Sequence, residues 1–133
     1  MSGNMSRTSS SGDEITITCL FLGHSPSKAF AIDIRNSKAI SSLKQEIAKK
    51  RPDLIGNIIP DELDLFYGNI STVQETDKQG KIKYKSDNQI TAAIQEFMKT
   101  NPEPERGFME LDTFLPLGVK CIHFVFRIPD NGA

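Results

Sequence analysis

The sequence is poor in the features that would announce a function class. Its 16 Lys and Arg nearly balance its 17 Asp and Glu, so a formal net charge of −1 offers no overall field to attract nucleic acid or an anionic membrane. No run approaches the ~18 apolar residues that a membrane span needs. Residues 1–12 contain no apolar segment, so we expect no secretory signal in the sequence as written.

Residues that could carry chemistry are also scarce. The only Cys and His residues are Cys19, His24, Cys121 and His123. Both cysteines lie in apolar strand-like patterns, so we expect buried free thiols rather than a disulfide framework. Compact Cys-x-x-Cys pairs, typical of structural zinc sites, are absent, and a thiol in a strand core is neither accessible nor of low pKa. We therefore predict no catalytic, cofactor-binding or metal-binding residue, and a small enzyme is the least favoured alternative.

A chain of 133 residues fits one domain. Residues 1–13 are rich in Ser and Gly and have little to bury, which predicts a disordered arm. We expect the folded domain to occupy residues 14–129 and a polar tail to occupy residues 130–133.

The stretch at residues 15–22 dominates the predicted fold. Apolar and polar residues alternate from Ile15 to Thr18, and the run from Cys19 to Leu22 has no polar residue. Its β-branched and aromatic composition favours a strand. Alternation suits a strand with one wet face, whereas a continuous apolar run suits a strand covered on both sides. This pattern predicts a strand in the middle of a sheet, with a neighbour on each side.

Turn-forming residues at 23–28 predict a hairpin to a second strand at 29–35. A helix should follow, capped by Asn36-Ser37 and ended by Pro52. Its apolar stripe, which includes Ile40, Leu43 and Ile47, would cover the hairpin, with Lys44 on the opposite, wet side.

The rest of the chain predicts smaller elements around a strong final strand. We expect a loop at 53–60, a strand at 63–67 that ends at Gly68, and a polar surface hairpin within 71–87. A second helix capped by Asp87-Asn88 should follow, with apolar residues at helical spacing from Ile90 to Met98. A loop should occupy 101–107, and the last strand should occupy 120–128.

This order of elements predicts an α+β fold. The first and last strands have the apolar composition of strands inside a sheet, and they lie at opposite ends of the domain. We therefore expect them to pair with each other in parallel. That is the ubiquitin-like β-grasp: a mixed sheet packed against one main helix, here with a second short helix and a polar hairpin insertion. The segment I-P-D-E-L-D-L-F-Y-G (59–68) resembles ubiquitin's proline-containing loop and the strand after it.

Four segments in order resemble the amino-terminal header domain of Crinkler effectors. They are C-L-F-L-G-H-S-P-S-K-A-F-A-I-D-I (19–34), I-S-S-L-K-Q-E-I (40–47), D-E-L-D-L-F (61–66) and I-H-F-V-F-R-I-P (122–129). Two departures are visible. Gly-His follows Leu22 where the oomycete motif has Ala-Lys, and Phe66 stands where a Trp is common. These departures predict a divergent member, compatible with a fungal one.

The resemblance implies a non-catalytic amino-terminal domain that is secreted, delivered into host cells, with the host nucleus as one destination, and engaged in protein–protein contacts during virulence or symbiosis. An independent intracellular ubiquitin-like adaptor is the alternative. The motif and interaction residues that the Crinkler resemblance implies are Leu20, Phe21, Leu22, Gly23, His123 and Pro129.

The expected partner is a protein, and a free sheet edge could also support a homodimer. The lysines at 78–85 surround Tyr84, which is the composition of a single-stranded nucleic acid site. We interpret them instead as the solvated face of a hairpin and expect no nucleic-acid binding by this domain.

Overall fold

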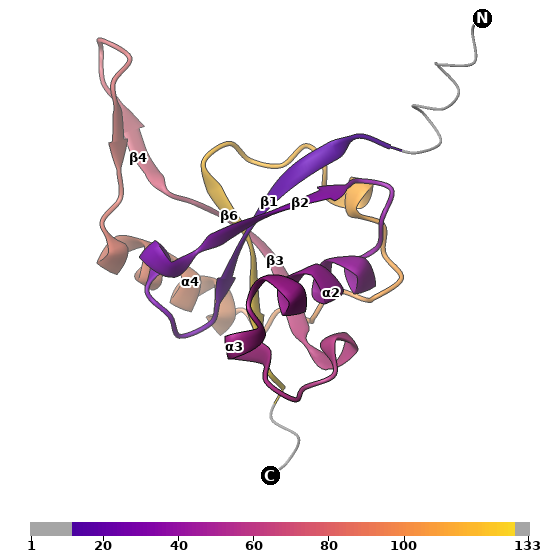
Figure 1. Cartoon of the computed structure of the whole chain (residues 1–133). Coiled ribbons are helices and arrows are strands. Elements are labelled where there is room, and N and C mark those ends of the chain that lie inside the picture. The colour runs from indigo at the N-terminus through magenta and orange to yellow at the C-terminus, as the bar shows by residue number, and fades with distance from the viewer. Residues whose placement is uncertain (1–11, 130–133) are drawn as a thin grey trace, which may run out of the picture.

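Four strands form a mixed sheet with helices on both of its faces (Figure 1). The computed structural model describes residues 12–129, except for the side chain of Glu75. The strand order is β2-β1-β6-β3, and the bounds are β1 Glu14–Phe21, β2 Phe30–Arg35, β3 Asp64–Ser71 and β6 Cys121–Arg127. The predicted α+β class with a mixed sheet is confirmed. The predicted arm at 1–13 lies almost entirely outside the described residues, as does the tail at 130–133.

β1 is a central strand, as its pattern predicted. It pairs antiparallel with β2 and parallel with β6, and Leu20 lies opposite Val125. In the first half of β1, Ile17 is buried while Thr16 is exposed; in the second half, Cys19 and Leu20 are both buried although they point to opposite faces. The change from alternation to a continuous apolar run therefore marks where the second face of the sheet becomes covered.

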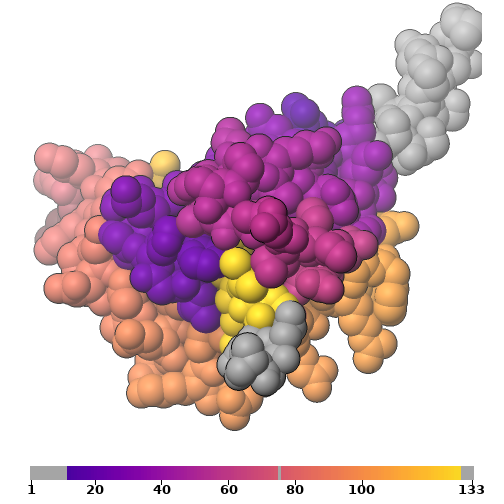
Figure 2. Space-filling model, turned by 60° about the horizontal axis from the view of Figure 1, so that its bottom comes forward, coloured from indigo at the N-terminus to yellow at the C-terminus, as the bar shows by residue number. Residues whose placement is uncertain are grey.

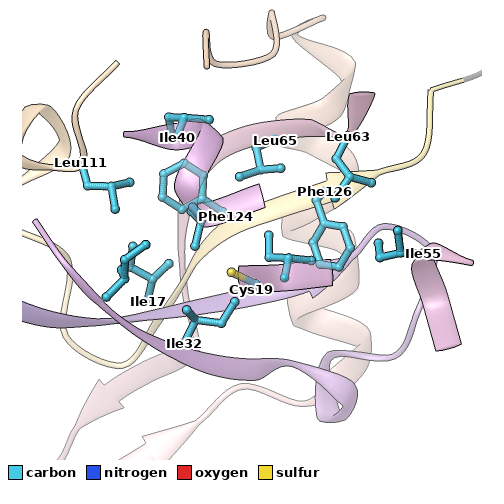
Figure 3. Packing of buried hydrophobic residues seen from close by; sticks show 13 residues of the cluster. Ile17, Cys19, Ile32, Ile40, Ile55, Leu63, Leu65, Leu111, Phe124 and Phe126 are labelled. Atoms are coloured by element: carbon cyan, nitrogen blue, oxygen red, sulfur yellow. The ribbon is translucent and has the colours of Figure 1, made fainter. Parts of the chain in front are cut away.

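Helix α2 (Ile40–Lys50) covers one face of the sheet with the predicted apolar stripe. Ile40, Leu43 and Ile47 are fully buried there against residues of all four strands (Figure 3). The predicted cap at Asn36-Ser37 is wrong, because α2 begins after Ala39 with no side-chain cap. Its first free amides bond across the chain instead: those of Ile40 and Ser41 donate to carbonyls of the 107–109 segment, at 2.8 and 2.9 Å.

Lys44 does not lie on a wet face of α2, contrary to the prediction. The residue is 8% exposed, and its Nζ donates to the Asp61 carbonyl at 3.1 Å. The expected loop at 53–60 also contains structure, since α3 (Pro52–Ile55) and the 3-10 turn η2 (Pro60–Glu62) each begin with proline. The Lys44 contact holds η2 against α2.

Helix α4 (Asp87–Lys99) covers the other face of the sheet. It is 13 residues long and thus not the short helix that was predicted, since α2 has 11. Its cap is Ser86, not Asp87-Asn88, in a reciprocal pair with Gln89. The second core that α4 closes contains Leu20, Phe66, Ile70, Ile90, Ile94, Ile122 and Val125. The predicted packing of the sheet against one main helix is therefore incomplete, because helices cover both of its faces.

β3 continues past Gly68, where the prediction ended it. The register of β3 with β6 shifts between Tyr67 and Ile70, and Asn69 has φ 48°. This irregularity lets the chain carry on to Ser71 with Ile70 turned toward α4. The predicted polar hairpin is present as β4 (Val73–Thr76) and β5 (Ile82–Tyr84), and it projects away from the sheet (Figure 1).

Short turns join the remaining elements. The 3-10 turn η1 (Pro26–Lys28) lies in the β1–β2 loop, and η3 (Leu111–Phe114) precedes β6. The 101–107 segment is a loop, as predicted. None of the helices within residues 12–129 has the length and apolar character needed to cross a membrane.

Candidate interaction site at the end of β1

The end of β1 and one flank of α4 form a groove of about 620 Å³, which we call the β1–α4 groove. One wall comes from β1 and the turn after it, and the other comes from α4. In Figure 2 the indigo start of the chain borders the orange part that contains α4. Its lining residues are Leu20, Leu22, Gly23, His24, Ser25, Thr91, Ile94, Gln95, Met98 and Lys99. Three of the predicted motif residues therefore line one groove.

Local backbone features hold the β1 wall in place. The Leu22 amide donates to the Phe126 carbonyl at 2.8 Å, which extends the parallel pairing beyond β1. Gly23 then turns the chain with φ +99°, a conformation that other residues rarely adopt. Beyond the turn, Ser25 Oγ donates to Asp87 Oδ2 at 2.9 Å and ties the loop to the start of α4.

The walls of the groove suit the binding of apolar side chains. Leu20, Leu22, Ile94 and Met98 make its walls apolar, and methionine adapts readily to differently shaped partners. Among the described residues that line it there is no carboxylate. Lys99 on its rim pairs with Glu96 at 3.1 Å, but both side chains are more than 70% exposed, so this pair holds neither residue firmly.

Phe21 is not part of the groove. Its ring packs on the α2 face of the sheet, with its centroid 5.3 Å from that of Phe126 and 4.9 Å from that of His24. Alternation along β1 explains the separation, because neighbouring residues of a strand point to opposite faces. The motif thus divides into Leu20 and Leu22 on the α4 side and Phe21 on the α2 side.

His123 lies buried where β1 and β6 diverge, away from the groove. The Thr18 amide donates to its Nδ1 at 3.0 Å, and its Nε2 is 2.8 Å from the Gly118 carbonyl oxygen. Because Nδ1 accepts, the neutral ring must carry its proton on Nε2 and donate it to Gly118. The imidazole thus takes the place of a backbone partner for Thr18, which is a structural role. Pro129, half-buried two residues after β6, does not line the groove either.

Both cysteines are free, as predicted, but only Cys19 is fully buried. Burial raises the pKa of the Cys19 thiol, and it also raises that of Cys121 although Lys85 acts in the opposite sense. Within residues 12–129 no cluster of three or more His, Cys, Asp or Glu could hold a metal ion. Because a raised pKa keeps a thiol protonated, neither cysteine is activated as a nucleophile.

The α4 wall of the groove was missed by the sequence-based interpretation. Thr91, Gln95 and Lys99 are spaced four apart and form one stripe beside the buried face of α4. That spacing was visible in the sequence. What the sequence did not predict is that α4 packs beside β1, which brings these residues to the groove.

One of three comparisons with known proteins places the chain in a family. A search of curated proteins found no match. A solved structure with some likeness is the NMR structure of Arabidopsis thaliana At2g32350, which is 16% identical over 88% of each chain with a TM-score of 0.39, too low to support an argument. The family model of the Crinkler effector protein N-terminal domain matches residues 15–127, in agreement with the resemblance found in the sequence. The chain therefore belongs to the Crinkler effector family through its N-terminal domain.

Proposed function

We propose that this domain is the non-catalytic amino-terminal domain of a secreted Crinkler-type effector, which acts in delivery into host cells through contacts with a protein partner. One observation carries the proposal: Leu20, Leu22 and Gly23 of the Leu-Phe-Leu-Gly motif line the apolar β1–α4 groove. A groove of this size accepts a few apolar side chains of a partner. We also propose that the folded domain occupies residues 14–129.

The fold of this domain is, on this proposal, a ubiquitin-like β-grasp. The antiparallel β1–β2 pair, the parallel pairing of β1 with β6, and α2 packed across them support that assignment. The β4–β5 hairpin and α4 are additions between β3 and β6. Since α4 forms one wall of the groove, the proposed binding site depends on what was added to the simpler arrangement.

Delivery can be measured with the full chain joined to the short fragment of a split fluorescent protein. The protein is applied to host cells that express the complementary fragment, so only delivered chains give fluorescence. We expect Leu22→Asp to lower the signal several-fold, because a carboxylate in an apolar groove opposes partner binding by about 1–3 kcal/mol or more. The matched control is Ile59→Asp, since Ile59 is 60% exposed and lies outside the groove.

The outcomes separate delivery from groove binding. A wild-type signal no higher than that of the reporter fragment alone would refute delivery. Equal signals from wild type and Leu22→Asp, with both proteins shown to be folded by circular dichroism, would refute the role of the groove.

A second contact surface that we propose is the outer edge of β2, as the site of a homodimer. β2 has β1 as its single neighbour in the sheet, whereas the other edge strand, β3, accepts the Glu105 amide on its Leu65 carbonyl at 2.7 Å. Unpaired backbone groups on an edge strand can add a partner strand. β2 is therefore the more available edge for a second copy.

Light scattering over a range of protein concentrations tests the dimer. We expect the mass to rise toward twice that of the monomer, and Ala31→Lys on β2 to prevent this rise because an edge lysine opposes strand addition. Ala92→Lys is the control, since Ala92 is also exposed but lies on α4. A mass that stays at the monomer value at every concentration would rule the dimer out.

A further inference from the structure

Strand β5 of the projecting hairpin has a neighbour on one side alone. In the described part of the chain it pairs with β4, and all three of its residues are exposed (Figure 1). The base of the hairpin is fixed, because the Lys85 amide donates to the Thr72 carbonyl at 2.8 Å and Thr72 Oγ1 donates to the Lys120 carbonyl at 2.6 Å. A ribbon of two strands is marginally stable in water, and a third strand would stabilise it.

The hydrogen bonds of the hairpin show which backbone groups of β5 point outward. The Asp77 amide donates to the Lys81 carbonyl at 2.9 Å, and the amide at position 85 bonds across the hairpin in the same way. Bonded and unbonded residues alternate along an antiparallel ladder, so Lys83 also bonds to β4. The amides and carbonyls of Ile82 and Tyr84 therefore point away from β4. These four groups can bond to the backbone of a partner strand.

The side chains of β5 alternate between two faces of the hairpin. One face is cationic, since Lys83 shares it with the lysines at 81 and 85. The other face is apolar, with Ile82 37% exposed and Tyr84 55% exposed. A strand added to this edge would therefore meet lysines on one side of its backbone and apolar groups on the other.

Nearby carboxylates do not balance the three lysines of the cationic face. Glu75 is in register with Lys83 and so is placed beside one of them. The Asp77 carboxylate accepts the amides of Gln79 and Lys81 at 3.0 and 2.7 Å, so it is engaged in shaping the tip of the hairpin. The free edge is thus complementary in charge to an acidic strand.

We infer that the outer edge of β5 binds an extended segment of a partner protein in which acidic and apolar residues alternate. In an antiparallel addition, two apolar residues of the partner bond to the backbone of Ile82 and Tyr84 and cover their side chains. Acidic residues then lie opposite the lysines, where opposite charges on facing strands stabilise the pair.

The same lysines select against other occupants of this edge. A second copy of β5 would place lysine opposite lysine, which opposes pairing. A nucleic acid could meet the lysines through its phosphates, but it would leave the apolar face and the outward backbone groups of β5 unused. An acidic strand uses all three features of the edge. This site is separate from the β1–α4 groove and does not depend on it.

The test is a nuclear magnetic resonance titration of the full chain with the peptide S-E-V-E-V-E-S. At a peptide concentration ten times its Kd, we expect solvent exchange of the Ile82 and Tyr84 amides to slow roughly 10-fold, because bound chains are protected. No slowing at these two amides at any soluble concentration of the peptide would overturn the inference.

Two further peptides separate strand addition from attraction by charge alone. The peptide S-E-E-E-V-V-S has the same composition without alternation, and a second peptide keeps the original sequence with both valine amides methylated. We expect each to bind roughly 10-fold more weakly, because backbone hydrogen bonds are lost. Equal binding of either peptide would overturn the inference, and so would tighter binding of a single-stranded oligonucleotide.

A charge exchange locates the acidic residue of the partner. Lys83→Glu should weaken binding of S-E-V-E-V-E-S roughly 5-fold, and the peptide S-E-V-K-V-E-S should restore it, because opposite charges then face each other again. Lys38→Glu is the control, since it makes the same change at an exposed position outside the hairpin; we expect a change of no more than about 2-fold, because salt screens distant charges. Equal losses in the two variants, or no restoration, would overturn the inference.

Discussion

Replacement of Phe124 by alanine is expected to lower the free energy of unfolding by about 3–5 kcal/mol. The Phe124 side chain is fully buried in β6 beneath α2 (Figure 3). Its ring centroid lies 5.4 Å from those of both Tyr67 and Phe114. Removal of the ring opens a cavity in the middle of the larger core, which the strands on each side of β6 cannot close. Urea unfolding followed by circular dichroism measures the loss.

The matched control for this variant is Phe108→Ala. Phe108 is 71% exposed and its ring lies 6.0 Å from the Arg106 guanidinium, an exposed contact that contributes little. We expect a change below about 1 kcal/mol. Similar losses for the two phenylalanines would contradict the placement of Phe124 at the centre of the core.

Leu20→Ala should cost about 2–5 kcal/mol of unfolding free energy. Leu20 is buried between β1 and α4 and belongs to the second core, with Val125 as its neighbour on β6. Its loss leaves α4 without one of its main apolar contacts on the sheet. The same urea experiment measures this loss. Coincident unfolding transitions at two wavelengths show that unfolding remains cooperative.

Leu22→Ala is the companion to Leu20→Ala within the same motif. Leu22 is half-buried at the wall of the β1–α4 groove, so its truncation should cost less than about 1.5 kcal/mol. The pair distinguishes a side chain that supports the fold from one that is available to a partner. If Leu22→Ala destabilised the protein more than Leu20→Ala, this division of roles would be wrong.

The arrangement of the central strands could be predicted because local pattern and burial agree there. Residues 19–22 are apolar without interruption, and this stretch is covered on both faces, next to a β6 of similar composition. The α2 stripe was predictable for the same reason, since Ile40, Leu43 and Ile47 follow helical spacing and all point inward.

The errors lie where distant segments decide the outcome. Lys44 looks like a surface residue in sequence, but η2 places a carbonyl within reach of its amine. The start of α2 is bonded by the 107–109 segment rather than by Asn36-Ser37, and β3 passes Gly68 by means of an irregular pairing with β6. Each of these depends on a segment that is not adjacent in sequence, which a local pattern does not report.

The candidate site was half predictable for a related reason. Leu20, Leu22 and Gly23 could be singled out as a compact motif, whereas Met98 and Lys99 became part of the groove only through the docking of α4. Phe21, His123 and Pro129 were predicted together with them as motif or interaction residues, but they lie elsewhere. Phe21 is on the α2 face of the sheet, His123 is where β1 and β6 diverge, and Pro129 is just past the end of β6.

The two helix layers have a consequence for how such a small protein meets other molecules. A sheet with one helix layer keeps a broad flat face for recognition, but here α2 and α4 enclose the strands from both directions. The β1–α4 groove and the outer edge of β2, both proposed for binding, accordingly lie at the perimeter of the sheet. The groove and the β2 edge are thus built from the margins of the elements, while the interiors of both sheet faces serve the two cores.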